Sequence, residues 1–326
     1  MKISAHINIK PLNIDLDRIA VEYGPFSMSF NFELEKLIRS IGVNGIINTP
    51  LLFDEAGEKL TIISGFRRIK AAESMGMTHL ECRVLTPDNI TPQECLALNF
   101  FENISTRQFN DIEKAMAINR LSAHLKNDEV KDEYLPLLGI SPSKRNLELY
   151  KKIDSDLRDE IRMQLAKGKI PIKVIREMLE MDNETREELF KIIIGFGLNN
   201  NQQRNLIDFT RDLASIKGIS LRDVIGRVAG EDIGCEHANL PQRARSLMKK
   251  LKGLRYPKLS ESEARFSRQI KRLELPKEVR IGASPFFEEP YYHLEIMFKD
   301  GIELTRQLKV IYDAEGIENL GDPWLE

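Results

Sequence analysis

The sequence predicts a multidomain protein with an α/β domain first, an all-α middle and a small α+β domain at the end. Three observations predict this fold class. Short apolar runs alternate with helical patterns through residue 85, and strand patterns then give way to helical ones from about residue 92. Strand patterns return in the last 50 residues or so, and a chain of 326 residues is too long for one small core.

The first domain is expected to span residues 1–105. Its apolar runs PLLF and LTII, separated by DEAGEK with Gly57, are typical of a β-hairpin. Glycines at positions 45 and 76 end the two predicted helices. In order, the expected elements are a helix at 32–45, strands at 50–53 and 60–63, a helix at 66–75 and a strand at 81–85.

The remaining chain is predicted to hold a helical domain at 106–215, a basic helical linker at 216–258 and an α+β domain at 259–326. Asn110 followed by Glu113 indicates a capping box at the start of one helix. Further helices are expected at about 92–103, 128–138, 142–153, 155–167, 171–181, 183–195, 260–275 and 301–314, strands at 277–282 and 291–298, and a polar break at 199–205.

Composition is ordinary for a globular protein, with a net charge of −2 and a pI near 6.3, so the bulk charge does not indicate nucleic-acid binding. Cys82, Cys95 and Cys235 are odd in number and widely spaced, which predicts a reducing cytoplasm and neither a disulfide framework nor a zinc site. No apolar run approaches the length of a membrane span, and the N-terminus lacks the apolar stretch of a secretion signal. We therefore expect a cytoplasmic protein without a membrane partner.

The stretch LTIISGFRRIKAAESMG places two arginines in the first turn of a predicted helix, where the helix dipole makes cations unfavourable. A phosphate bound at this strand–glycine–helix junction would explain them, because it could accept hydrogen bonds from the free N–H groups and from both guanidinium groups. The predicted phosphate-binding residues are Ser64, Gly65, Arg67 and Arg68. The alternative is that both arginines are surface residues paired with Glu73 or Asp54.

A second element lies at FFENISTRQFNDIEKA. Glu102 and Asn103 could supply hard oxygen ligands for Mg²⁺ beside phosphates if they lie in a loop, and Arg107 could add a phosphate contact. The alternative is a helix end followed by the N-cap of the next helix, which would explain Asn103 and Asn110 without a ligand.

Together these stretches resemble the ParB chromosome- and plasmid-partition proteins. The counterparts of the family motifs are Ser40-Ile41 with Gly45 and Pro50, then Gly65-Phe66-Arg67-Arg68-Ile69-Lys70-Ala71, then Glu102-Asn103-Ile104-Ser105-Thr106-Arg107. The resemblance implies a ParB/sulfiredoxin-like α/β domain, a helix-turn-helix domain and a C-terminal dimerisation domain. It also implies CTP bound with Mg²⁺, with the arginine turn on the phosphates and the Glu-Asn pair near the metal.

In the family, CTP and specific DNA close the dimer into a clamp that slides on DNA, and slow hydrolysis of CTP reopens it. The resemblance therefore implies double-stranded DNA, a second copy of the chain and a partition ATPase as partners, and a location on the nucleoid. This sequence departs from the family motifs at three places. Phe66 replaces a glutamate, Ser105-Thr106 replace Gln-Arg, and the loop EYGPFSMSF lacks the usual N-P-x-Q-P-R. Whether this chain hydrolyses CTP is left open.

Residues 128–153 fit a helix-turn-helix with its turn at Gly139-Ile140 and its second helix capped by Ser141. Leu147, Tyr150 and Ile153 would face the core at helical spacing. An ordinary helical hairpin is the alternative, because Pro136 ends the first helix late and Glu148 would face the groove. The predicted DNA-contacting residues are Ser141, Ser143, Lys144, Arg145, Asn146 and Lys151.

The linker segment 216–258 holds 10 basic and 4 acidic side chains, so it is a candidate for non-specific phosphate contacts. The alternative is a solvated helix paired with the acidic C-terminal domain. In the aromatic run PFFEEPYYHLEIMF, alternating residues predict a half-buried strand at a dimer interface. The predicted non-specific DNA contacts are Arg243, Arg245, Lys249, Lys250 and Lys252.

Three classes of function follow. The first is a dimeric ParB-like DNA-binding protein switched by CTP. The second is an enzyme of the nuclease or kinase type on the same scaffold, although no clustered Asp/His metal set supports it. Sulfiredoxins use a Gly-Cys-His-Arg turn, and the turn at Gly65 lacks that cysteine. The third is a sequence-specific transcription regulator whose nucleotide site has decayed.

Overall fold

A four-stranded sheet organises the first part of the chain in the computed structural model, which describes residues 9–230, 239–289 and 291–321. Its strands are β1 (Leu12–Asp15), β2 (Leu51–Phe53), β3 (Thr61–Ser64) and β4 (His79–Leu85). They lie in the order β1-β4-β2-β3. β2 pairs antiparallel with β3 and parallel with β4, and β4 pairs antiparallel with β1. The predicted hairpin and the predicted strand after it are confirmed.

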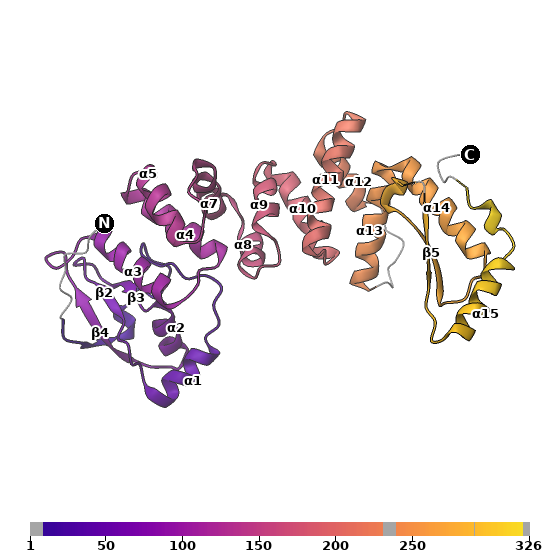
Figure 1. Ribbon diagram of the computed structural model, residues 1–326. Coiled ribbons are helices and arrows are strands. Elements are labelled where there is room, and N and C mark those ends of the chain that lie inside the picture. Colours follow the sequence, from indigo (N-terminus) through magenta and orange to yellow (C-terminus); the bar gives the residue numbers. More distant parts are fainter. Residues whose placement is uncertain (1–8, 231–238, 290, 322–326) are drawn as a thin grey trace. The chain divides into compact units, whose positions relative to one another are not determined.

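Three helices accompany the sheet: α1 (Glu35–Asn44), which packs against α2, then α2 (Phe66–Ser74) and α3 (Pro92–Thr106). α2 carries the chain from β3 to β4, and α3 packs against β3 (Figure 1). The buried face of α2 includes Phe66, Ile69 and Ala72, which join Leu52 and Ile62 of the sheet in one apolar cluster. Helical spacing of apolar residues thus fixes which side of α2 faces the sheet and leaves Arg67 and Arg68 on its other side.

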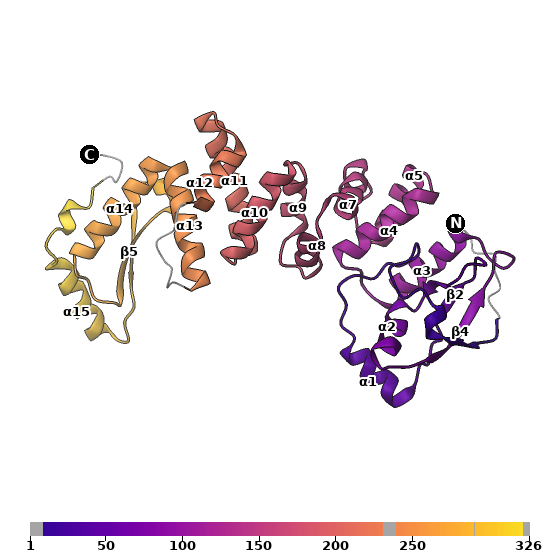
Figure 2. The same ribbon diagram turned by 180° about the vertical axis from the view of Figure 1, so that it is seen from behind.

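A run of helices follows, as predicted. Their bounds are α4 (Asp111–His124), α5 (Asn127–Glu129), the π-helical turn η2 (Val130–Tyr134), α6 (Leu135–Leu137), α7 (Lys144–Asp156), α8 (Asp159–Ala166) and α9 (Ile172–Leu179). α7 packs against α4 and α9, and α4 and α7 also lie side by side in the view from behind (Figure 2). The predicted capping box of α4 is present, since Asn110 and Glu113 each accept a hydrogen bond from the other's backbone N–H.

The chain divides into two compact units, residues 1–186 and 187–326. The domain boundaries predicted after residues 105, 215 and 258 stay predictions. From α10 onward the elements are α10 (Asn183–Gly195), α11 (Asn200–Lys217), α12 (Leu221–Gly230), α13 (Leu240–Arg255), α14 (Pro257–Arg272), β5 (Val279–Ala283), β6 (Tyr292–Ile296) and α15 (Gly301–Tyr312), with short 3₁₀ turns at Leu16–Arg18, Pro285–Phe287 and Ile317–Asn319. β5 and β6 form an antiparallel hairpin.

Two helix starts were predicted wrongly. The polar run 199–205 is no break, because Asn199 caps α11 and the helix continues through it. Ser143, and not Ser141, caps the helix after Gly139, accepting a hydrogen bond from Asn146 N at 3.1 Å. In both places polar side chains that suggest a loop are instead satisfying the free N–H groups of a helix start.

The strand predicted near the C-terminus is present as β6, and only its burial within one copy of the chain differs from the predicted alternation. β6 was expected to be half-buried by alternation, yet Leu294 is 51% exposed and Phe298, just beyond the strand, is 52% exposed. Tyr292 of the same strand stacks on Phe266 of α14, with ring centroids 5.2 Å apart. Within one copy of the chain, the described residues therefore cover only part of this hairpin.

Cys82 and Cys95 are buried and free, and burial raises the pKa of each thiol to about 12. Cys235 lies outside the described residues. Among the described helices, none combines the length and the hydropathy needed to cross a bilayer.

Candidate phosphate-binding site

The junction between β3 and α2 requires a glycine for steric reasons. Gly65 has a φ of 92°, and a Cβ there would lie 2.9 Å from Cβ and 3.0 Å from Cα of Pro50. Because Gly65 is the N-cap residue and has no side chain, it offers no side-chain acceptor to the first N–H groups of α2. The positive end of the helix therefore opens beside Arg67 and Arg68 without a capping acceptor from this position.

A pocket with a volume of about 330 Å³ lies at this junction. It is formed by the β3–α2 turn, the C-terminal half of α3 and the segment around Met28. All seven residues predicted for the phosphate and metal site line it, namely Ser64, Gly65, Arg67, Arg68, Glu102, Asn103 and Arg107. Further lining residues are Met28, Ser29, Leu37, Asn48, Phe66, Asn99 and Thr106.

Arg68 is held on one side of the pocket by Glu102. Arg68 Nη2 lies 2.8 Å from Glu102 Oε1, and its Nη1 donates to the carbonyl oxygen of Asn48. The hydroxyl of Ser64 donates to the other Glu102 oxygen. The Glu102 side chain is 41% exposed, so solvent weakens this ion pair and a stronger anion could compete for Arg68.

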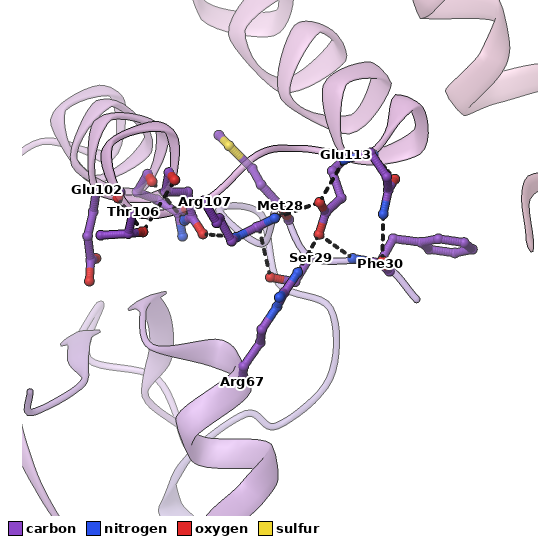
Figure 3. A network of polar contacts seen from close by, with 11 residues as sticks. Met28, Ser29, Phe30, Arg67, Glu102, Thr106, Arg107 and Glu113 are labelled. Carbon is purple, nitrogen blue, oxygen red and sulfur yellow. Dashed lines mark hydrogen bonds and ion pairs between the residues drawn. The ribbon is translucent and has the colours of Figure 1, made fainter. Parts of the chain in front are cut away.

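Arg67 is held on the other side by Glu113 of α4, a residue that the sequence indicated only as part of a capping box. Arg67 Nη2 lies 2.8 Å from Glu113 Oε1, and Arg107 Nη1 lies 2.5 Å from Glu113 Oε2 (Figure 3). The Glu113 side chain is only 2% exposed. In the sequence, the signal for this second role was an acidic residue placed among the apolar positions of a helix, where charged residues are rarely buried without a partner.

The predicted alternative partners of the two arginines are wrong. Glu73 pairs with Lys70 at 2.9 Å, and Asp54 accepts a hydrogen bond from Ala56 N in its own turn. The arginines do not point into bulk solvent either, since their side chains are 32% (Arg67) and 21% (Arg68) exposed. Both point toward carboxylates from helices far along the chain, which local spacing could not indicate.

Arg107 is bound almost entirely to protein groups. Besides Glu113, it donates from Nε to Asn103 Oδ1 at 2.8 Å and from Nη2 to the carbonyl oxygen of Met28 at 2.7 Å. Burial lowers the pKa of Arg107, the Glu113 carboxylate opposes that shift, and the charge of Arg67 adds to it. Because its donors are bound to protein groups, Arg107 stabilises the wall of the pocket in this conformation.

The fit of the pocket to Mg²⁺ differs between the two predicted ligands. Glu102 and Asn103 lie inside α3, not in a loop, so the loop expectation is wrong. The amide of Asn103 is engaged, since it donates to Asn99 and accepts from Arg107. No cluster of three or more His, Cys, Asp or Glu side chains occurs within the described ranges. Glu102 alone offers a carboxylate, which is enough for a Mg²⁺ carried by phosphates but not for an all-protein site.

Phe66, which stands where the resemblance places a glutamate, belongs to an aromatic cluster. Its ring stacks on Tyr23 with centroids 5.1 Å apart, and Phe32 meets its face edge-on at 5.8 Å. The Arg67 guanidinium lies 5.0 Å from the centroid of the Phe32 ring. Position 66 therefore supplies packing and a cation–π neighbour for Arg67, and no carboxylate.

In the predicted DNA-reading segment, the core assignment is confirmed, because Leu147, Tyr150 and Ile153 are buried. Lys144 and Arg145 are exposed, and Arg145 is 4.0 Å from Glu180. The amide of Asn146 is used internally, donating to the carbonyl oxygen of Ser141 and accepting from Arg176 Nη2 at 3.0 Å.

Two of the remaining predicted contact residues in this segment also bind protein groups. Ser143 caps α7, and Lys151 donates to Asn127 Oδ1 at 2.7 Å. Ser141 is exposed. Lys144 and Arg145 are thus the predicted base or backbone contacts that project most freely from the start of α7.

Of the residues predicted for non-specific DNA contacts, some contact protein groups and others are exposed. Lys252 pairs with Glu263 at 2.7 Å, and Arg243 lies over the ring of Phe196 at 5.0 Å. The predicted pairing with the acidic C-terminal segment is therefore present at Lys252. Arg245 and Lys249 are exposed on α13, as is Lys250, which borders an apolar pocket between α11, α12 and α13.

Fold and pocket together define an α/β domain with an arginine-lined polar pocket, continued by a helical region. The chain is similar to a probable chromosome-partitioning protein ParB from Coxiella burnetii, with 28% identity over 201 residues, covering 61% of this chain and 65% of that protein. A ParB of the same description from Pseudomonas putida is 25% identical over 176 residues, 53% of this chain and 57% of the relative. A probable plasmid-partitioning protein ParB from Thermus thermophilus is 31% identical over 107 residues, 33% of this chain and 34% of the relative.

This chain is thus a sequence relative of the ParB partition proteins, and it spans less than two thirds of the length of these curated relatives. No protein-family model matches it. Two crystal structures of a C-terminally truncated ParB from Caulobacter crescentus were also found. The one complexed with CTP-γ-S is 18% identical with a TM-score of 0.26, covering 53% of this chain and 93% of that one. The one complexed to the centromeric parS site is 16% identical with a TM-score of 0.33, covering 60% and 98%.

Proposed function

We propose that this chain is a ParB-like DNA-binding partition protein whose α/β domain binds CTP at the pocket beside α2. The observation that carries the proposal is the convergence of Arg67 and Arg68 on one pocket at the positive end of that helix. The sequence relationship to ParB proteins supports the same reading. CTP is the nucleoside triphosphate that the family resemblance implies, and its phosphates would lie against the two arginines.

The metal would be a Mg²⁺ carried by the phosphates, with Glu102 as its single protein carboxylate. Glu102 also binds Arg68 and Ser64, so the carboxylate that would hold the metal is the one that positions Arg68. Bound Mg²⁺ supplies neutralisation of phosphate charge, and the chain's own part is to orient that charge with Arg67 and Arg68. Slow hydrolysis of CTP is not needed for this binding role.

The same proposal extends to partners. α7 would present Lys144 and Arg145 to DNA bases or backbone, and Arg245, Lys249 and Lys250 would add contacts to phosphates. A second copy would join through the C-terminal region, where the β5–β6 hairpin leaves Leu294 and Phe298 exposed. CTP and specific DNA would close this dimer as a clamp. A partition ATPase is a further candidate partner, and binding to chromosomal or plasmid DNA would place the protein on the nucleoid.

The nucleotide part is tested by thermal unfolding with and without ligand. We expect CTP with Mg²⁺ to raise the melting temperature more than ATP with Mg²⁺ does, because only a ligand that binds the folded chain stabilises it. Arg67→Ala should abolish the shift, while Lys70→Ala, one turn away and paired with Glu73, should retain it. No shift with any nucleoside triphosphate would overturn the CTP proposal.

The DNA part is tested by selecting genomic fragments and then measuring binding at several salt concentrations. A dimer with two reading helices should recover a short inverted repeat. Arg145→Ala should reduce the preference for that repeat by about 1–3 kcal/mol if it contacts a base. Lys249→Ala should weaken binding to all sequences alike and lower the salt slope by about 0.9. Uniform recovery of genomic sequences would contradict specific reading by α7.

The second candidate function is a transcription regulator whose nucleotide site has decayed. One observation favours it, namely that Arg67 and Arg68 are both paired with carboxylates of the chain itself. A specific DNA site without any nucleotide-induced shift in melting temperature would identify this function.

A further inference from the structure

Glu113 has more bound donors than a helix cap requires. Its Oε1 accepts from Arg67 Nη2 at 2.8 Å and from Phe30 N at 3.1 Å. Its Oε2 accepts from Arg107 Nη1 at 2.5 Å and from Asn110 N at 3.1 Å (Figure 3). The last of these bonds is the capping bond, and the other three connect α4 to the pocket and to the segment at residue 30.

Two other capping boxes in the chain show what the cap alone needs. Glu94 does the same work at the start of α3, with Oε2 accepting from Thr91 N at 3.0 Å. Gln202 does it at the start of α11, with its amide oxygen accepting from Asn199 N at 3.0 Å. A glutamine therefore suffices for the cap, so the cap does not require the negative charge at position 113. The neighbours of that charge are the two guanidinium groups, which it pairs with.

The charges at this place do not cancel. Two guanidinium groups share one carboxylate, which leaves one positive charge at the pocket wall. Arg107 also donates to Asn103, Met28 and Ser29, so its hydrogen bonds are nearly complete. Of the Arg67 nitrogens, only Nη2 is hydrogen-bonded within the described residues, and Nε is buried without a partner. The uncompensated charge and the unused donors therefore belong to Arg67.

We propose that Glu113 is a positioning residue for the phosphate site: it fixes the Arg67 guanidinium at the pocket wall and leaves Nη1 of Arg67 for the ligand. This inference rests on the proposed nucleotide function. Glu113 itself stays on its four donors when a phosphate binds, because leaving would strand the part-buried N–H groups of Phe30 and Asn110. The residue acts through Arg67 and does not touch the ligand.

This role and a purely electrostatic one predict opposite signs for Glu113→Gln. Removing a negative charge beside an anion site should tighten anion binding if only the net charge matters. If Glu113 positions Arg67, the variant should bind more weakly, because a glutamine amide offers one acceptor and cannot hold both guanidinium groups.

The experiment measures the affinity of the 326-residue chain for CTP with Mg²⁺ and for inorganic tripolyphosphate by isothermal titration calorimetry. We expect Glu113→Gln to weaken both by about tenfold or more, as for the loss of one oriented charged contact. Glu94→Gln is the matched control, since it makes the same change in a capping box outside the pocket, and it should bind as the unmodified chain does. Melting curves of both variants without ligand report whether each is folded.

The outcomes distinguish a failure of the positioning role from a failure of the proposed nucleotide function. If the unmodified chain binds neither ligand, the proposed nucleotide site and the role of Glu113 both fall. If it binds and Glu113→Gln binds equally well or more tightly, the positioning role alone is overturned. Should Glu113→Gln not fold, Glu113→Asp decides, because it keeps the charge and shortens the reach. Weaker binding by Glu113→Asp supports positioning, and unchanged binding contradicts it.

Discussion

Gly65 illustrates how much of the site is set by single residues. Its left-handed conformation turns the chain from β3 into α2, and its missing Cβ lets Pro50 approach the turn. The sequence indicated the turn and the helix start, but the close approach of Pro50 is a tertiary contact between separate strands. The glycine is therefore needed for the backbone whether or not a phosphate binds.

We expect Gly65→Ala to destabilise the protein more than Gly76→Ala, which lies at the other end of the same helix. Both glycines have positive φ, 92° and 70°, so both variants carry strain of roughly 1–2 kcal/mol. Only at Gly65 would the new methyl group meet Pro50, adding roughly 1–3 kcal/mol, since a Cβ at Gly76 has no neighbour within 4 Å. The free energy of unfolding from urea titrations measures the difference, and equal losses would contradict the steric argument.

Sequence reasoning found the residues that carry the ParB resemblance and missed the residue that connects them. Arg67 and Arg68 were predicted from a helix-dipole argument, and both line the pocket. Glu113 was predicted only as a cap, because its contacts with Arg67 and Phe30 join residues 46 and 83 positions apart. Long-range ion pairs leave no periodic trace in the chain, so spacing rules cannot find them.

At the scale of elements, the positions of helix starts were predicted less accurately than the elements themselves. Ser141-Pro142 has the form of a cap followed by a first-turn proline, yet α7 begins at Lys144 and its cap is Ser143. The turn at Gly139 was predicted correctly, and it has a φ of 71°. Two extra residues of extended chain thus separate the turn from α7, which changes the side chains in its first turn.

We expect Ser143→Ala to lower the free energy of unfolding by about 0.5–2 kcal/mol, because it removes the acceptor for Asn146 N. Ser141→Ala is the control, and its effect should stay within about 0.5 kcal/mol, since only the backbone oxygen of Ser141 is used by Asn146. Chemical denaturation of both variants tests this. A larger loss in Ser141→Ala would restore the cap that the sequence first indicated.

At the scale of the whole molecule, the C-terminal hairpin has apolar side chains that one copy of the chain leaves exposed. Leu294, Met297 and Phe298 follow one another along β6 and its end, each about half exposed. The sequence pattern correctly marked this run as apolar and strand-forming. It could not determine what covers the run, because burial between copies leaves the same pattern as burial within one.

We expect the protein to be a dimer whose self-association Leu294→Asp weakens by at least about tenfold, because burying a carboxylate in an apolar contact is costly. Ile216→Asp places the same charge on an exposed apolar position of α11, where Ile216 is 61% exposed, and should leave association unchanged. Sedimentation velocity over a range of concentrations measures both. An unmodified chain that is monomeric at tens of micromolar, or equal effects of the two variants, would refute dimerisation through this hairpin.

By itself the sequence determined the order of the elements from α1 to β4, the glycine turn before α2 and the basic side chains beside it. Those features are local, since they follow from the periodicity of apolar residues and from backbone conformations that glycine adopts. Only the tertiary structure decided which carboxylates meet Arg67 and Arg68 and which donors are left for a ligand. The reason is that charges 34 and 46 positions apart become neighbours only when α2, α3 and α4 have come together.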